Sequence, residues 1–417
     1  MNSLASDFYK TAQQICSQPF NLIAKPISYL CNLDCHYCFY LSKAQLYHNT
    51  QEHRMSDETL NLFIRQYISR QPATTRELHF IWQGGEPTLL GVDFFKKAVA
   101  YQKKYSRDGM IIYNSFQTNG VLINEDWCSF FKDNNFLVGI SIDGDEELHN
   151  HYRKFKDGRG SFSFVMKAIE LFKKKGVEFN TLTTVHHFNS KEPKRVYSFL
   201  KSIGSLFMQF IPIVEPQQEN DGTSRGVAPY LDNLTNSLRS VSADGWGHFL
   251  IDIFNMWIEQ DLGNIFIPFF EAIIATLYGY PSPLCTFRDC CGRAMVIEHN
   301  GDIYSCDHFV FPEYKIGNIH QKDLELIVNC DKQIDFALNK YLQLAKKCQR
   351  CPYKILCFGE CPANRIIGTK EGGKLNHLCE GYYNFFRHSV SSFEAIAKAL
   401  KEGDDCRNFK KYIQKKP

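Results

Sequence analysis

The chain has 417 residues, 44% of them hydrophobic, with 34 Phe and 21 Tyr, so it is long enough to bury a large core. Its formal net charge is +3 and it has no long basic run, which argues against nucleic-acid binding. The first residues lack the charged and apolar segments of a signal peptide. The most apolar long stretch, residues 265–280, is too short and interrupted to span a bilayer. We therefore expect a cytoplasmic protein that binds neither nucleic acid nor membrane.

Strands and helices are predicted to alternate through the first half of the chain. The strands are expected at residues 20–28, 77–82, 110–116, 136–142, 177–185 and 206–213, and the helices at residues 56–68, 94–105, 125–132, 165–172 and 192–203. Such alternation indicates a parallel sheet, so the expected fold class is α/β, a partial (β/α)6 TIM-like barrel. The polar residues that follow its strands should gather at one mouth.

The pattern changes after about residue 220. A polar loop is predicted at 217–227, then helices near 250–257 and 267–277, a cysteine-rich part from Cys285, and a last helix at 382–400. We therefore expect a barrel at 1–220, a helical connection at 221–284, a cysteine-rich domain at 285–381, and a C-terminal helix and tail at 382–417.

Three cysteines follow the first predicted strand with C-x3-C-x2-C spacing: Cys31, Cys35 and Cys38. Three thiolates can hold three irons of a [4Fe–4S] cube and leave the fourth iron open to a small molecule. The alternatives are three unrelated thiols and a zinc knuckle. The knuckle needs a fourth ligand, and His36, inside the loop, is poorly placed to close a tetrahedron.

With Tyr37 before the last cysteine and a Gln-Gly-Gly-Glu-Pro segment at residues 83–87, the loop resembles the radical S-adenosylmethionine (SAM) enzymes. The resemblance implies a [4Fe–4S] cluster on the three cysteines, SAM on the open iron, and a 5′-deoxyadenosyl radical. It implies SAM-binding roles for residues at the strand ends, namely Tyr40, Gln83, Gly84, Gly85, Glu86, Ser141, Asp143 and Arg153. Gly84, Gly85 and Glu86 would hold the amino group, and Ser141 and Arg153 the carboxylate. Two alternatives stay open: Arg153 as a surface charge and Tyr40 as a core aromatic.

Eight further cysteines lie in the C-terminal part: Cys285, Cys291, Cys306, Cys348, Cys351, Cys357, Cys361 and Cys379. Two fully ligated [4Fe–4S] clusters need eight thiolates, as do two zinc sites. The spacing resembles the SPASM domain, which carries two auxiliary clusters. That resemblance assigns Cys285, Cys291, Cys306 and Cys361 to the first, and Cys348, Cys351, Cys357 and Cys379 to the second. Cys290, beside Cys291, leaves one ligand ambiguous, and Cys16, Cys128, Cys330 and Cys406 are expected to be ordinary thiols.

The stretch Tyr304-Ser-Cys306-Asp307-His308-Phe309 resembles the matching stretch of anaerobic sulfatase-maturating enzymes. The resemblance implies that Asp307 is the catalytic base, whereas a turn-capping Asp is the alternative. It also implies oxidation of a Cys or Ser in a C/S-x-P-x-R motif of an unfolded sulfatase to formylglycine, with an electron donor such as flavodoxin or ferredoxin. Two other hypotheses stay open: a SPASM enzyme that forms a thioether or other crosslink, and a non-enzymatic iron–sulfur carrier or sensor.

Overall fold

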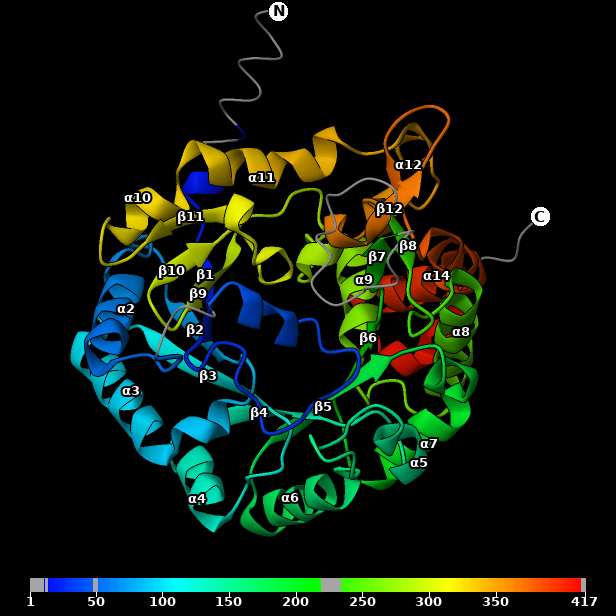
Figure 1. The fold of residues 1–417 in the computed structure, drawn as a ribbon. Coiled ribbons are helices and arrows are strands. Elements are labelled where there is room, and N and C mark those ends of the chain that lie inside the picture. The colour runs from blue at the N-terminus through cyan, green and yellow to red at the C-terminus, as the bar shows by residue number, and fades with distance from the viewer. Residues whose placement is uncertain (1–10, 12–13, 48–51, 219–233, 414–417) are drawn as a thin grey trace, which may run out of the picture.

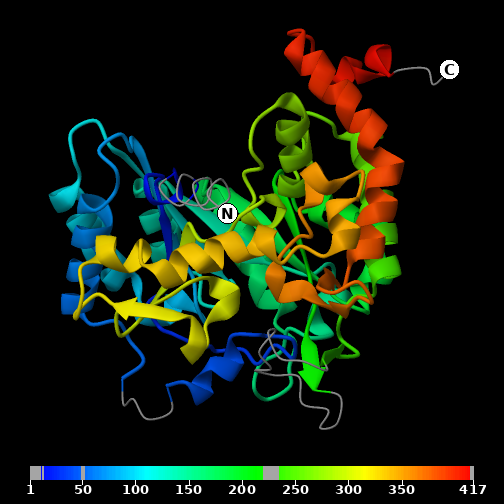
Figure 2. The same ribbon diagram turned by 90° about the horizontal axis from the view of Figure 1, so that it is seen from above.

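The computed structural model describes residues 11, 14–47, 52–218 and 234–413 (Figures 1 and 2). All six predicted strands are present and pair in parallel in chain order, so the predicted fold class is confirmed. They are β1 (Asn21–Lys25), β2 (Glu77–Trp82), β3 (Ile111–Thr118), β4 (Phe136–Ser141), β5 (Phe179–Val185) and β6 (Met208–Pro212).

Helices cover the outside of this sheet, as Figure 1 shows. They are α2 (Asp57–Ser69), α3 (Val92–Tyr105), α4 (Glu125–Asp133), α6 (Phe162–Lys175) and α7 (Pro193–Ser202), with the short α5 (Glu146–Asn150) after β4. Ser56 caps α2 by accepting a hydrogen bond from the Thr59 N–H, and Gly176, at φ 65°, ends α6 in the left-handed region. Buried aromatic rings join sheet to helices; Phe95 of α3 packs 5.0 Å from Phe116 of β3. This packing fixes the strand ends from which the site is built.

Three more strands extend the sheet beyond β1. β9 (Ala294–Glu298) lies parallel to β1, with Asn21 opposite Ala294 and Lys25 opposite Glu298. β10 (Asp302–Tyr304) and β11 (Lys315–Asn318) follow as antiparallel neighbours. The start of the cysteine-rich segment is therefore part of the same nine-stranded sheet, which the sequence patterns did not predict. The domain boundaries given above stay predictions.

A second helical group packs beside the barrel. It comprises α8 (Ala243–Gln260), α9 (Pro268–Tyr278) and the long α14 (Cys379–Lys401), which runs alongside α8 (Figure 2). The two helices approach closely at Gly247 and Gly381: a Cβ atom on Gly381 would lie 2.1 Å from the Ala243 carbonyl oxygen. None of the helices in the described part of the chain is both long and apolar enough to cross a membrane.

Shorter elements lie between β11 and α14. They are α10 (Leu324–Val328), α11 (Asp331–Leu342), α12 (Lys346–Gln349), α13 (Lys354–Cys357) and the hairpin β12 (Arg365–Gly368)–β13 (Lys374–Asn376). Of the loop predicted at 217–227, residues 219–227 lie outside the described residues. The prediction is wrong for residues 217 and 218, because they belong to β7 (Pro216–Gln218), which pairs with β8 (Leu234–Asn236).

Candidate active site

The cysteine loop leaves β1 at the mouth of the barrel and brings three thiols together. Burial, and then the nearby Glu86 carboxylate, raises the pKa of Cys31 to about 12. Burial also raises the pKa of Cys35, and the Cys38 and Cys31 thiols add to this rise. A metal centre stabilises the thiolate form that burial disfavours. The three thiols therefore fit the radical cluster predicted from their spacing, and their role as ligands stays a prediction.

Gly84 and Gly85 follow β2 and allow the chain at the end of this strand to pack closely against the cysteine loop. The Gly85 N–H donates to the Ser28 carbonyl at 2.7 Å, and the Glu86 N–H donates to the Leu30 carbonyl at 2.9 Å. A Cβ atom on Gly85 would lie 1.9 Å from the Leu30 carbonyl oxygen, so only glycine fits there. Gln83 is half-buried, and its N–H donates to the Ala24 carbonyl at 3.0 Å. These backbone hydrogen bonds form a narrow cradle at Gly85 that a side chain would fill.

The Glu86 carboxylate is 1% exposed and is engaged by the protein itself. Its Oε1 accepts hydrogen bonds from the Thr88 N–H at 3.1 Å and the Thr118 hydroxyl at 2.8 Å, and its Oε2 accepts from the Asn119 N–H at 2.7 Å. Burial raises the pKa of Glu86, and these hydrogen bonds oppose the rise. The Asn119 amide reaches the Cys31 sulfur at 3.6 Å. Glu86 thus ties the ends of β2 and β3 to the cysteine loop, and its contact with SAM stays a prediction.

Asp143 and Arg153 form a buried ion pair beside the same loop. Arg153 Nε lies 2.8 Å from Asp143 Oδ2, and the two residues are 8% and 0% exposed. Tyr37 donates its hydroxyl to the same carboxylate oxygen. Burial alone would raise the pKa of Asp143, but the Arg153 guanidinium holds it below its ordinary value. Arg153 is therefore not a surface charge, which removes that alternative. Ser141, at the end of β4, is partly exposed, and its contact with SAM, like that of Arg153, stays a prediction.

His186 is a site residue that the sequence patterns missed. It directly follows β5 and is fully buried. Its Nδ1 accepts from the backbone N–H groups of Phe188 and Asn189, so Nε2 carries the proton. Within the described ranges Nε2 has no hydrogen-bond partner, and the ring lies 6.0 Å from that of Tyr37. A buried unpaired donor at the barrel mouth fits a polar ligand.

Asp307 faces a buried lysine from the end of β1. Its Oδ1 lies 2.7 Å from Lys25 Nζ, and the two side chains are 14% and 1% exposed. The ammonium also lies 4.3 Å from the centre of the Tyr40 ring, and the Tyr40 hydroxyl donates to Glu298. Tyr40 is thus a buried member of the network around Asp307, and its contact with SAM stays a prediction.

Lys25 and Glu298 had no assigned role in the sequence. The available signal was a lysine ending the otherwise apolar strand Asn21–Lys25. Lys43 completes this set of buried charges. Its ammonium lies 3.5 Å from the centre of the Phe311 ring. Burial lowers the pKa of Lys43 to about 8, although the carboxylates of Asp307 and Glu298 oppose this change. The network places a partly exposed carboxylate beside Cys306, where it can act as a proton acceptor.

The eight C-terminal cysteines gather into two sets of four. Burial raises the pKa of Cys306 well above its ordinary value, and its neighbouring thiols add to the rise; these are Cys361, Cys285 and Cys291. Cys361 is buried, whereas Cys285 lies at the exposed edge of this set. The other four line one cavity of about 650 Å³: Cys348, Cys351, Cys357 and Cys379. The two sets have the membership that the SPASM resemblance implied, and both fit iron–sulfur clusters.

The other cysteines lie outside both sets. Cys290 packs beside the cluster of Ile15, Ala337 and Leu338, so Cys291 is the member of the first set. None of the sixteen cysteines, all of which lie in the described residues, forms a disulfide. In the described part of the chain no three His, Cys, Asp or Glu side chains converge on a site for a single metal ion.

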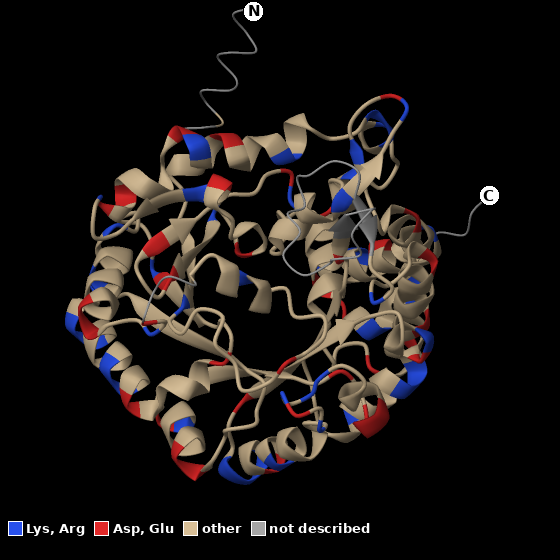
Figure 3. Ribbon diagram, in the orientation of Figure 1, with Lys and Arg blue, Asp and Glu red and all other residues tan. Residues whose placement is uncertain are grey.

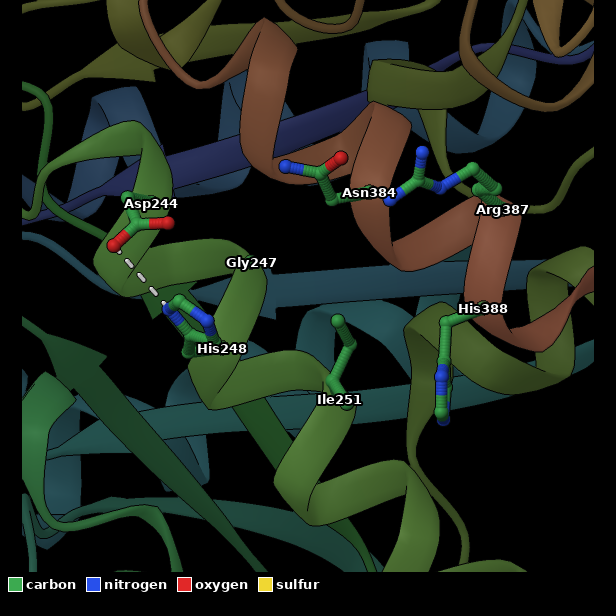
Figure 4. A pocket seen from close by; sticks show the side chains of 7 residues that line it. All are labelled: Asp244, Gly247, His248, Ile251, Asn384, Arg387 and His388. Carbon is green, nitrogen blue, oxygen red and sulfur yellow. Dashed lines mark ion pairs between the residues drawn. The ribbon is translucent and has the colours of Figure 1, made fainter.

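A separate cleft of about 300 Å³ lies between α8 and α14 (Figure 4). His248 pairs there with Asp244 at 3.3 Å, and both side chains are more than 70% exposed. The His388 ring lies on the α14 side and bonds to Asn255 at 2.7 Å. None of the cysteines lines this cleft, so it is not part of the site described above.

Comparison with known proteins agrees with this site. Residues 26–200 match the radical SAM superfamily, and residues 285–352 match the SPASM iron–sulfur cluster-binding domain. The chain is thus a radical SAM enzyme with an iron–sulfur SPASM domain. It is 44% identical to a serine-type anaerobic sulfatase-maturating enzyme of Bacteroides thetaiotaomicron over 92% of both chains. It is 34% identical to a cysteine-type enzyme of Clostridium novyi over 91% of this chain and 98% of the relative.

Solved structures give the same result. The native anSMEcpe structure with bound AdoMet is 33% identical, with a TM-score of 0.80 over 91% of this chain and 100% of that chain. The structure of the same protein with AdoMet and the Cp18Cys peptide is 32% identical, with a TM-score of 0.79 over 92% and 99%. The chain belongs to the family of anaerobic sulfatase-maturating enzymes.

Proposed function

We propose that the protein oxidises a Ser or Cys residue in the C/S-x-P-x-R motif of an unfolded sulfatase to formylglycine. Its cofactors are SAM and three [4Fe–4S] clusters. The observation that carries the proposal is the Asp307 carboxylate, held 2.7 Å from the buried Lys25 ammonium and adjacent to Cys306. Its family supports the same reaction, because named relatives mature sulfatases and a solved relative binds a peptide.

Each group of residues has one task in this reaction. When bound, the cluster on Cys31, Cys35 and Cys38 and its SAM supply the radical that removes a hydrogen atom from the substrate β-carbon. Asp307 accepts the proton of the substrate hydroxyl or thiol. The ion pair between Asp143 and Arg153 and the cradle at Gly85 fix the strand ends around the cysteine loop.

The chemistry also defines partners. Forming the carbonyl removes a hydrogen atom, a proton and one more electron, so the last electron needs a redox acceptor. The eight C-terminal cysteines are suited to hold such groups. A one-electron donor is also required, for which a flavodoxin or ferredoxin is suited. We expect this to occur in the cytoplasm, on a substrate chain that has not yet folded.

A preference for serine is favoured by the relatives. Serine-type enzymes are 44% and 36% identical to this chain, whereas cysteine-type enzymes are 34% and 33% identical. A hydroxyl is a weaker acid than a thiol, so a positioned base contributes more to its oxidation. We therefore expect both residue types to react, and serine to react with the higher kcat/KM.

The test uses two short peptides that carry the target motif and differ only in Ser or Cys. Reduced, cluster-loaded protein is incubated with SAM and each peptide, and formylglycine and 5′-deoxyadenosine are measured together by mass spectrometry. Equal amounts of the two products would support the proposal. A thioether-linked peptide in place of the aldehyde would favour the crosslinking enzyme. Absence of SAM cleavage would favour the carrier or sensor.

A further inference from the structure

Lys and Arg side chains, most of them exposed, surround the cavity that Cys348, Cys351, Cys357 and Cys379 line. Lys347, Arg350, Lys354 and Lys370 lie along its walls, and Lys346 is exposed beside them. We call these five residues the basic rim. They come from α12, from the start of α13 and from the loop after β12, three short segments that fold together around the cysteines. In Figure 3 this part of the molecule carries Lys and Arg in blue along α12 and the β12–β13 hairpin.

The charge of the basic rim is mostly unneutralised. Arg350 pairs with Glu371, but the four lysines form no ion pair with any other described residue. Residues 346–380 contain seven Lys and Arg and three Glu, a net charge of +4, while the whole chain has a net charge of +3. The segment that forms this cavity is therefore positively charged overall.

Large apolar side chains are exposed on the same elements. Ile355 of α13 is 55% exposed, Ile367 of β12 is 43% exposed, and Tyr383, which lines the cavity, is 37% exposed. Cations mixed with exposed aliphatic and aromatic groups are typical of a surface that binds another protein. A surface that binds only phosphate has no use for Ile355 or Ile367.

We infer that the basic rim is the docking surface for a small acidic electron-transfer protein of the flavodoxin or ferredoxin class. This rests on the proposed function, in which the last electron of the substrate needs a redox acceptor; the oxidised form of the partner would accept that electron at this surface. Docking there places the redox group of the partner beside the four thiols. Opposite charge on the two surfaces accelerates encounter and orients the partner, as a transient redox complex requires.

The test measures the binding of a purified acidic flavodoxin to cluster-loaded enzyme. The variant carries Lys346→Glu, Lys354→Glu and Lys370→Glu, and leaves Lys347, the neighbour of Cys348, unchanged. The matched control carries Lys103→Glu, Lys104→Glu and Lys167→Glu, which alter net charge equally at exposed positions of α3 and α6. The rim variant should raise Kd about 10-fold or more at low salt, with a shallower salt dependence. The control should change Kd less than about twofold.

Three further measurements decide the interpretation. Iron content equal to that of the wild type shows that the variants still hold their clusters. Equal weakening by both variants, or none by the rim variant, would overturn the inference. Loss of substrate-peptide binding with unchanged flavodoxin binding would assign the surface to the substrate and also overturn it. Formylglycine formation driven by dithionite tests the proposed function separately: it should persist in the rim variant, and its absence in the wild type would refute the proposed function alone.

Discussion

The two sets of four cysteines have the same ligand chemistry but different surroundings. The set around Cys306 lies against the strands that extend the barrel sheet, beside Asp307 and the buried Lys25. The set around Cys348 lies in a surface cavity bordered by the basic rim. Cysteine spacing alone does not separate their roles. Neighbouring charges and burial distinguish the two sets, and in the proposals above the first adjoins the substrate site and the second faces a redox partner.

The cations near the two sets show the same contrast. Near the first, Lys340 is 1% exposed and donates to the backbone carbonyls of Cys285 and Thr286 at 2.6 and 2.8 Å, and Lys25 pairs with Asp307. Buried charges are costly unless they are engaged in this way. Near the second set, the half-buried Lys354 and the exposed Lys370 line the cavity without an ion pair to any residue that the structure describes.

Removing one thiol from each set tests the comparison most strongly. Cys306→Ala and Cys348→Ala should each lower iron content by about four atoms out of about twelve, because each cluster needs its four thiolates. Cys306→Ala should abolish formylglycine formation and weaken peptide binding, because Cys306 holds Asp307 in place. Cys348→Ala should leave peptide binding intact, as measured by fluorescence anisotropy of a labelled peptide. Equal loss of peptide binding in both variants would mean that the two sets are not functionally distinct.

Removing the catalytic base should lower formylglycine formation less than removing a cluster does. Asp307→Asn keeps the size of the side chain and removes its basicity, so formylglycine formation should fall by about 10²–10⁴-fold. SAM cleavage needs no such base and should persist, giving 5′-deoxyadenosine without peptide oxidation. Asp335→Asn, at an exposed position of α11, is the matched control. Wild-type formylglycine yield from Asp307→Asn would remove Asp307 from the mechanism.

Loss of the buried Lys25 ammonium should have a smaller effect. Removing one partner of a buried ion pair costs about 3–5 kcal/mol, so Lys25→Met should lower kcat for formylglycine at least about 10-fold by displacing Asp307. Lys25→Arg should restore part of it, which a purely apolar packing role would not predict. Lys354→Met, in the basic rim, should leave dithionite-driven kcat unchanged. A similar loss in Lys25→Met and Lys354→Met would contradict the contrast between the two sets of cations.

The smallest expected effect concerns Lys43 and pH. Burial lowers its pKa from 10.5 in the unfolded chain to about 8. Between these values the unfolded state binds the proton more tightly, so stability rises with pH. From pH 7.5 to 9.5 this contribution to the free energy of unfolding should increase on the order of 1–2 kcal/mol, and Lys43→Met should lose that increase.

Hydrogen exchange of the amides in residues 40–46, corrected for the intrinsic pH dependence of exchange, measures this contribution in the cluster-loaded protein. Lys103→Met, at an exposed position of α3, is the matched control for loss of one positive charge. An unchanged pH dependence in Lys43→Met would show that another group titrates in this range.

Local sequence patterns predicted the six barrel strands but not the three strands that extend their sheet. The alternation of apolar segments predicted all six parallel strands, and the strand ends carry the cysteine loop and residues 83–87 as expected. β10 has only three residues, too few for a periodic signal, and the pairing of β9 with β1 joins distant segments. The opposition of Lys25 and Glu298 exists only once that register is formed. The burial of Arg153 also depends on tertiary packing, so it could not be inferred from the charge of the residue.

The sequence predicted the number of C-terminal metal centres but not, from spacing alone, which cysteines belong to each. The count of eight and the spacings indicated two metal centres, but the crossing of Cys361 to the first set depends on the resemblance to SPASM domains. In the structure the burial of Cys361 beside Cys306 gives the physical basis for this grouping. Sequence spacing reports which thiols are near along the chain, whereas the fold brings together thiols that are far apart.

The pairing of β1 with β9 sets an order for synthesis. About 270 residues separate the two strands, and at 5–20 residues per second a ribosome needs roughly 15–55 s to deliver β9 after β1. During that interval one edge of β1 has no neighbour, and Lys25 has neither Asp307 nor Glu298 nearby. The emerging polypeptide therefore exposes an apolar edge next to three reactive thiols. Its need for chaperone protection is greatest until the last third of the chain has left the exit tunnel.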